Sequence, residues 1–256
     1  QPFGKLLLCN NETNCISCIM FNKFAAILIL LSLVACNKPK NKPAAAMSYP
    51  VNSLQLIVVQ TQDWPSTSGT MLLLERADTA AEWQVIDSFD VMVGRSGMAR
   101  DKNSSWQQTA NDPIKQEGDG CAPSGIFSLG TVFSYHALDS INMPSKQVNK
   151  NDLCVDDINS KYYNTLIDVD TILEKDFNSF EYMRRDDHQY EYGVWVNYNT
   201  NPQIPGNGSC IFLHIYKTPT TPTSGCTAMS KENMLKLIHW LNASKNPMLI
   251  QYPIHR

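Results

Sequence analysis

Residues 206–234 read GNGSCIFLHIYKTPTTPTSGCTAMSKENM, and this stretch decides the fold class. Apolar side chains alternate through residues 209–216, which is the period of a β-strand, and His214 lies near the end of that strand. A loop rich in Pro and Thr follows, and Ser230 is the predicted N-cap of a helix. The apolar residues after it recur at helical spacing: Met234, Leu237, Ile238 and Leu241.

Outward from this stretch, strand patterns predominate. Turn-rich segments separate runs that are rich in β-branched and aromatic residues. We therefore predict a single, mainly β domain over residues 53–252 with a few short helices. The runs expected to be strands are 54–60, 70–76, 83–93, 192–198 and 247–252.

Composition excludes several classes of protein. The chain has 256 residues, of which 43% are apolar and 18% charged, too apolar a balance for a disordered chain. It has 21 Lys and Arg against 24 Asp and Glu, so no basic excess is available for nucleic acid and we expect no nucleic-acid partner. Eight cysteines are too few for a small disulfide-built scaffold.

The pattern of the N-terminal region predicts a targeting segment. Residues 24–35 (FAAILILLSLVA) are too short to span a membrane and follow a lysine, as in a secretory signal. Because this run ends in Cys36, residues 20–36 resemble a bacterial lipoprotein signal with lipidated Cys36; an ordinary cleaved signal or a short anchor is the alternative. We expect residues 1–19 to be non-native upstream sequence and residues 37–52, rich in Lys, Pro and Ala, to be a flexible tether.

From residue 36 onward the chain has five cysteines. If Cys36 carries lipid and one other serves as a reactive thiol, three remain, so at least one is unpaired. In an oxidising compartment two of Cys121, Cys154 and Cys210 can form a disulfide, but the sequence does not assign the pair. We expect buried free thiols, because free cysteine packs as a small apolar residue.

A candidate catalytic pair lies in the opening stretch. His214 ends a predicted strand, and Cys226 follows twelve residues later on the returning loop. A thiol attacks as thiolate, and a neighbouring imidazolium lowers its pKa. Gly225 allows the backbone N–H groups near Cys226 to approach a reacting carbon and hold an oxyanion. This pattern indicates a Cys-His acyl-transfer site; a buried cysteine beside an unrelated strand histidine is the alternative.

The same residues resemble the signature of the L,D-transpeptidases, the YkuD-type catalytic domain family. In that family a His precedes, across a loop, a Ser/Thr-His-Gly-Cys motif that carries the nucleophile. Similar stretches in consistent order extend the resemblance over residues 54–250. They are KQEGDG (115–120) with PSGIF (123–127), CVDD (154–157) with YYN (162–164), and EYMR (181–184) followed by Tyr190.

The resemblance implies roles for particular residues. Cys226 would be the nucleophile and His214 its base, with the backbone carbonyl of Ile215 orienting the imidazole. Backbone N–H groups around Gly225 and Cys226 would form the oxyanion hole. Ser224 stands where the family often has His, so its supporting role departs from the common motif.

Other charged residues have two interpretations each. Arg184 lies in a family-like stretch and would contact a substrate carboxylate, or else it is one of a group of surface charges. Glu117 and Asp119 form either a paired-carboxylate acid and base or a turn, and Gly118 and Gly120 favour the turn. We expect no metal and no cofactor, because the histidines lack zinc-site spacing.

For the whole domain, the resemblance implies a β-sandwich of mixed sheets and acyl transfer on peptidoglycan stem peptides through a cysteine thioester. A stem amine as acceptor gives cross-linking. Water gives an L,D-carboxypeptidase, and attack on a wall-bound protein gives an amidase. A degenerate wall-binding lipoprotein is a third class. We expect a lipid-anchored periplasmic protein, at the outer membrane because Asn37 follows Cys36.

Overall fold

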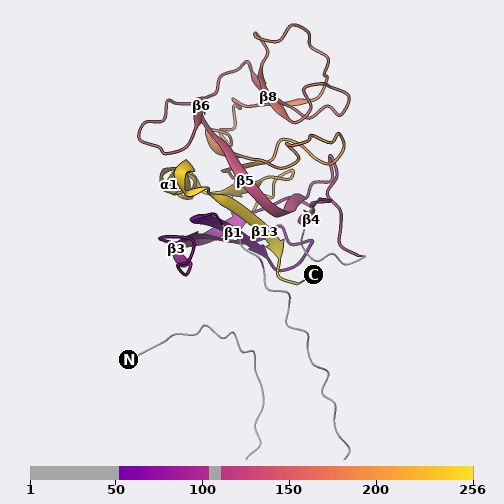
Figure 1. Cartoon of the computed structure of the whole chain (residues 1–256). Helices are drawn as coiled ribbons and strands as arrows, with labels where there is room; N and C mark the ends of the chain where they lie inside the picture. Colours follow the sequence, from indigo (N-terminus) through magenta and orange to yellow (C-terminus); the bar gives the residue numbers. More distant parts are fainter. Residues whose placement is uncertain (1–51, 104–110, 256) are drawn as a thin grey trace, which may run out of the picture. The chain divides into compact units, whose positions relative to one another are not determined.

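The computed structural model describes residues 52–103 and 111–255 (Figure 1). The predicted signal with Cys36 lies outside the described residues, as do residues 1–19 and all of the predicted tether except Asn52. Within the described ranges, no helix is both long enough and apolar enough to cross a bilayer.

The described residues form thirteen β-strands, one α-helix and one 3-10 helix. The mainly β class predicted from the sequence is therefore confirmed. The strands are β1 (Gln55–Thr61), β2 (Ser68–Glu75), β3 (Gln84–Met92), β4 (Met98–Arg100), β5 (Ala122–Ser134), β6 (Ser145–Gln147), β7 (Asp152–Val155), β8 (Thr165–Asp168), β9 (Phe180–Tyr182), β10 (Tyr192–Val196), β11 (Phe212–Ile215), β12 (Thr227–Met229) and β13 (Met248–Pro253); the helices are α1 (Lys231–Trp240) and η1 (Ala243–Lys245).

The main sheet closes on itself. Its strands follow the order β10-β11-β12-β3-β2-β1-β13-β5, and β5 pairs again with β10. This is a barrel-like arrangement, and the expected two-sheet sandwich is not what the strand pairings describe. A separate sheet, β8-β7-β9, lies beyond the β6 end of β5 (Figure 1).

The core explains why these segments pair. Strand β1 is buried along almost its whole length, and it lies between β2 and a parallel β13. Helix α1 begins as predicted, because the Ser230 hydroxyl accepts a hydrogen bond of 3.1 Å from the Asn233 N–H. Its apolar face is fully buried against the sheet, which stabilises the fold by about 1.5–3 kcal/mol for each large side chain. That face consists of Met234, Leu237, Ile238 and Leu241.

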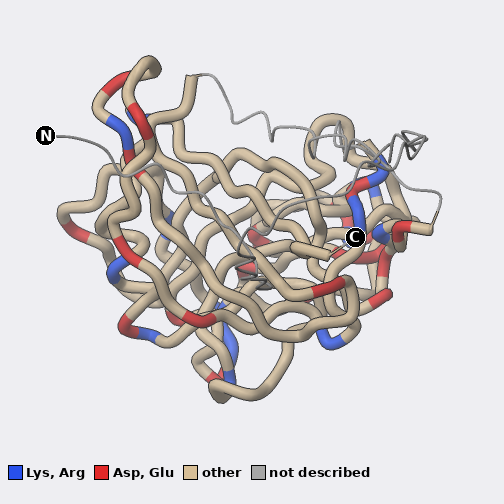
Figure 2. Tube along the Cα trace, turned by 90° about the horizontal axis from the view of Figure 1, so that it is seen from below, with Lys and Arg blue, Asp and Glu red and all other residues tan. Residues whose placement is uncertain are grey.

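Charges are spread over the domain. Figure 2 shows acidic and basic residues mixed around the described chain, without a face of one sign. This distribution agrees with the formal net charge of −3.

One disulfide ties the small sheet to the main sheet. Cys154 on β7 is bonded to Cys210, which lies two residues before the start of β11. The expectation of free thiols is therefore wrong for these two residues, because the fold brings positions 56 residues apart within bonding distance. Cys121 and Cys226 are free and buried, as expected.

The disulfide gives a test of the fold. Closing a loop of this length restricts the unfolded chain, so we expect reduction to lower the free energy of unfolding by about 4 kcal/mol. Urea denaturation of the wild type with and without reductant measures the change. The Cys154→Ala variant is the control, since reductant should not lower its stability further. If the urea midpoint of the wild type were the same with and without reductant, the Cys154–Cys210 disulfide would be contradicted.

Candidate active site

The pairing of β11 with β12 brings the predicted cysteine and histidine to one face. The strands are parallel, and His214 pairs with Ala228. Cys226 lies two residues before Ala228, just ahead of β12. Because side chains alternate along a strand, Cys226 and Ala228 share a face, and His214 shares it with them across the ladder. Both Cys226 and His214 are buried.

Backbone groups hold the thiol. The Phe212 N–H donates a hydrogen bond of 3.3 Å to Sγ of Cys226, and the thiol contacts the Cys210 carbonyl oxygen at 3.5 Å. Cys210 has a φ of 54°, an uncommon value for a residue other than glycine. Its N–H is fixed by a 2.9 Å hydrogen bond to the side chain of Asn164. The disulfide-bonded residue therefore forms one wall of the thiol's site.

The turn before the thiol is built around Thr223. Its hydroxyl donates to the Cys226 carbonyl at 2.6 Å and accepts from the Gly225 N–H at 3.1 Å. Gly225 has a φ of 153°, and a Cβ atom there would lie 3.0 Å from the Cys121 carbonyl oxygen. The Gly225 N–H is thus already engaged. Among the described residues, the N–H groups of Ser224 and Cys226 have no hydrogen-bond partner, so both are free backbone donors of this turn; Ser224 is exposed, whereas Cys226 is buried.

His214 is held in one tautomer. Its Nδ1 lies 2.8 Å from the carbonyl oxygen of Ile215, the contact that the orienting role of Ile215 requires. A carbonyl only accepts, so in neutral His214 the proton resides on Nδ1. Nε2 is then unprotonated, and it is the ring atom able to accept a thiol proton.

Both groups are neutral at pH 7. Burial lowers the pKa of His214 to about 4, against the hydrogen bond to Ile215. Burial and the charge of Glu181 together raise the pKa of Cys226 to about 12, against the hydrogen bond from the Phe212 N–H. The sequence-based expectation of a thiol activated by an adjacent imidazolium is therefore wrong for this state, because both side chains lie out of water.

A phenol connects the thiol to a carboxylate. The Tyr190 hydroxyl donates a hydrogen bond to Glu181. It also lies close enough to Sγ of Cys226 to lower that thiol's pKa. The Tyr190 ring packs edge-to-face on His214, with 5.1 Å between ring centroids. Tyr190 thus lies against both His214 and Cys226.

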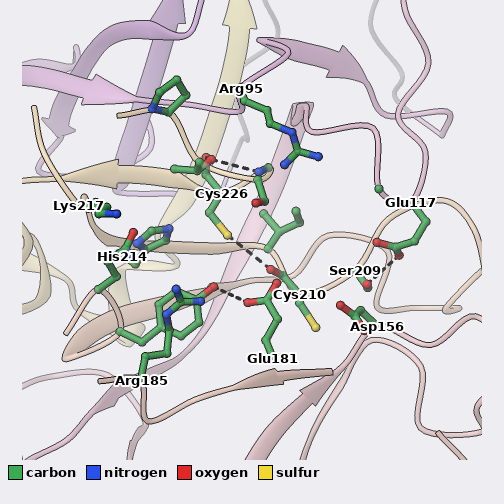
Figure 3. Close-up of a pocket in the computed structure, with 18 of the residues that line it drawn as sticks. Arg95, Glu117, Asp156, Glu181, Arg185, Ser209, Cys210, His214, Lys217 and Cys226 are labelled. Atoms are coloured by element: carbon green, nitrogen blue, oxygen red, sulfur yellow. Dashed lines mark hydrogen bonds between the residues drawn. The ribbon is translucent and has the colours of Figure 1, made fainter. Parts of the chain in front are cut away.

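These residues line a pocket of about 440 Å³ (Figure 3). Oδ1 of Asp156 is buried there without a hydrogen-bond partner in the described part of the chain. The pocket therefore offers charged groups of both signs beside the thiol. Its cations are Arg95, Lys115, Arg185 and Lys217, and its carboxylates are Glu117, Asp156 and Glu181.

A scan against family models matches residues 66–250 to the YkuD family, described as the L,D-transpeptidase catalytic domain. This chain belongs to that family. The match covers the His214 strand and the Cys226 turn, as well as most of the barrel-like sheet. No curated protein and no solved structure matched in the corresponding comparisons.

Within this L,D-transpeptidase-family domain, Arg184 and Arg185 have different positions. Arg185 lines the Cys226 pocket, whereas Arg184 does not; its guanidinium lies 5.0 Å from the centre of the Tyr135 ring. A role in binding a substrate carboxylate therefore suits Arg185 better than the predicted Arg184.

The Glu117–Asp119 segment is a turn, as its glycines indicated. The Asp119 carboxylate accepts hydrogen bonds from the N–H groups of Gln116 and Cys121 at 2.7 and 2.8 Å. Lys115 pairs with it at 2.7 Å. Glu117 instead accepts a hydrogen bond of 2.7 Å from Ser209. The two carboxylates thus have separate partners and do not form an acid-base pair.

The sequence reasoning missed Glu181 and Tyr190. Both were quoted in the family-like stretches, but no pattern showed that they meet the thiol. A buried tyrosine nine residues after a glutamate has no recognisable spacing. No group of His, Cys, Asp and Glu side chains in the described ranges is arranged to hold a metal ion.

Alkylation tests the neutral state of the thiol. Because only the thiolate reacts, the rate of iodoacetamide modification at Cys226 should rise about tenfold per pH unit up to pH 10 without a plateau. Peptide mapping by mass spectrometry follows Cys226 separately from Cys121. A free cysteine in a short peptide, with a plateau above pH 8.5 or so, is the control. A plateau at Cys226 below pH 8 would instead demonstrate a thiolate-imidazolium pair.

Proposed function

We propose that this protein is a peptidoglycan L,D-transpeptidase that acts on stem peptides through a thioester on Cys226. The observation that carries the proposal is the pairing of β11 with β12, which sets a buried thiol and a single-tautomer imidazole on one face of a charged pocket. Membership of the L,D-transpeptidase family supplies the reaction class.

In the first half-reaction, Sγ of Cys226 attacks the carbonyl carbon that precedes a terminal D-residue. Nε2 of His214 takes the thiol proton as the bond forms, so no free thiolate has to accumulate. The Cys226 N–H stabilises the oxyanion. His214 then returns the proton to the leaving amine, and a thioester remains on Cys226.

In the second half-reaction, an amine of another stem peptide attacks the thioester. The C–N bond forms, the C–S bond breaks, and the thiol is regenerated through His214. Water in place of the amine gives the L,D-carboxypeptidase product. A wall-bound protein as the substrate of the first step gives the amidase reaction. These alternatives share Cys226 and differ only in which molecule reaches it.

The pocket charges suit a stem peptide, which carries both carboxylates and an amine. Arg95, Arg185 and Lys217 line it and supply positive charge for carboxylates, although Arg185 already forms an ion pair with Asp187 at 2.5 Å. The unpartnered Oδ1 of Asp156 is available to an ammonium group. We further propose that a lipid on Cys36 holds the domain at the periplasmic side of a bacterial membrane, where this substrate lies.

Product analysis tests the proposal. Wild type incubated with disaccharide-tetrapeptide should give dimers that lack one terminal D-residue, as detected by mass spectrometry. Cys226→Ala should give none, and His214→Gln should reduce the rate by at least a hundredfold, because the general base is lost.

Cys121→Ala is the matched control, since Cys121 is the other buried free thiol of the described chain. It should retain dimer formation, and circular dichroism checks that each variant folds. A Cys226-dependent tripeptide without dimers would establish the carboxypeptidase instead. An untouched tetrapeptide would contradict the transpeptidase and leave the amidase or the degenerate wall-binding lipoprotein.

A further inference from the structure

Two hollows meet at the segment that contains β9. One is the Cys226 pocket, and the other is a neighbouring hollow of about 590 Å³. Glu181 and Arg185 line both of them. A molecule in the second hollow would thus contact the same carboxylate that faces the thiol pocket. The remaining residues of the second hollow are Lys150, Phe180, Tyr182, Arg184, Asp186 and Asp187.

Glu181 is fixed at this boundary. It lies in the middle of β9, where it pairs with Cys154 of β7, and Cys154 is tied by the disulfide to Cys210 beside the thiol. Its carboxylate accepts the hydrogen bond of Tyr190. Because that hydroxyl also lies near Sγ of Cys226, a single phenol separates the carboxylate from the nucleophile. Figure 3 shows Glu181 in the same pocket as Cys226 and Cys210.

In the proposed mechanism, no group yet accepts the first proton of the acceptor ammonium ion. His214 moves the thiol proton in the first half-reaction and the second amine proton in the last. An acceptor amine, however, arrives as an ammonium ion, which has no lone pair for attack. A base must take its first proton before the C–N bond can form. His214 shares the pocket with the thiol and is still needed for the proton that returns to sulfur.

We propose that Glu181 is the catalytic base for the acyl acceptor, taking the first proton from the ammonium group that approaches the thioester. The proposal rests on the transpeptidase function proposed above. The ammonium gives one proton to the carboxylate, which becomes a carboxylic acid and later releases that proton to water. The neutral amine then attacks, and its second proton reaches the departing sulfur through His214.

The charge environment supports this assignment. Burial raises the pKa of Glu181 to about 7, the Tyr190 hydrogen bond lowers it, Asp156 and Glu117 raise it, and Arg185 lowers it. A carboxyl group with this pKa binds a proton far better than an ordinary glutamate, and at neutral pH much of it is still charged. The second hollow adds Lys150, Arg184, Asp186 and Asp187 around the same group.

The two half-reactions separate the role of Glu181 from a structural one. Release of the terminal D-residue reports acylation, and cross-linked dimer reports transfer to the amine. In Glu181→Gln we expect the D-residue to be released in the first turnover at the wild-type rate or faster, because the charge that raises the Cys226 pKa is gone. Dimer formation should fall by at least thirtyfold, with the thioester diverted to tripeptide by water.

Glu174→Gln is the matched control. Glu174 is exposed, pairs with Lys161 at 3.8 Å and lines neither hollow. It should not change the ratio of dimer to tripeptide. Thermal melts of both variants check the fold.

Tyr190→Phe provides a second variant that keeps the ring packed on His214. It removes the hydrogen bond that favours the charged carboxylate, so the pKa of Glu181 should rise. In the pH–rate profile of dimer formation, the acid limb should then move to higher pH. In the profile of D-residue release, the acid limb is set by His214 and should stay in place.

Three outcomes would overturn the role of Glu181. These are an unchanged dimer-to-tripeptide ratio in Glu181→Gln, an equal loss of first-turnover release and dimer formation in that variant, and an unmoved acid limb of dimer formation in Tyr190→Phe. In each case the proposed function is still supported if the wild type forms cross-linked dimers. A wild type without Cys226-dependent release would instead overturn the proposed function and this role together.

Discussion

The arrangement of the site depends on the parallel pairing of β11 with β12. This short ladder fixes which face Cys226 occupies, and it brings the Phe212 N–H to within 3.3 Å of the sulfur. A slip of one residue would turn His214 to the opposite face and separate it from the thiol. The neighbouring strands β10 and β3 hold the ladder from both sides, so the closed sheet supports the site.

Burial keeps the Cys226 thiol protonated in the free protein. With the pKa of Cys226 raised to about 12 and that of His214 lowered to about 4, the free protein holds a neutral pair. Such a thiol is poorly reactive toward general electrophiles, and in the proposed mechanism its proton passes to His214 only as a bound carbonyl is attacked. The same burial that costs nucleophilicity therefore provides selectivity.

Local patterns predicted the parts of the fold that are locally determined. Runs rich in β-branched and aromatic residues located β1, β2 and β3, alternation located β10 and β11, and the N-cap at Ser230 located α1. The longest strand, β5, was not predicted, because Pro123, Gly125 and Gly130 interrupt its pattern. Those residues are tolerated because the strand is paired along its length with β13, β10, β4 and β6. Closure of the sheet is a long-range pairing, and no local pattern encodes it.

In the site, too, the features set by nearby residues were predicted and those set by long-range packing were not. The Cys226 turn and the His214 strand are close in sequence, so their meeting was predictable. Arg185 rather than Arg184 faces the thiol because neighbouring residues point to different sides, which requires the actual backbone. The disulfide between Cys154 and Cys210 and the Tyr190–Glu181 hydrogen bond depend on how the small sheet packs on the barrel.

The most direct test of the central claim, that Cys226 carries the acyl group, is an acid-quenched mass measurement. The folded protein would be mixed with a stem tetrapeptide for seconds, quenched, digested and mapped. The account predicts an adduct equal to the tetrapeptide without its terminal D-residue, on the peptide that contains Cys226 and removable by hydroxylamine. An adduct on Cys121, or none on any peptide while the tetrapeptide is consumed, would contradict it.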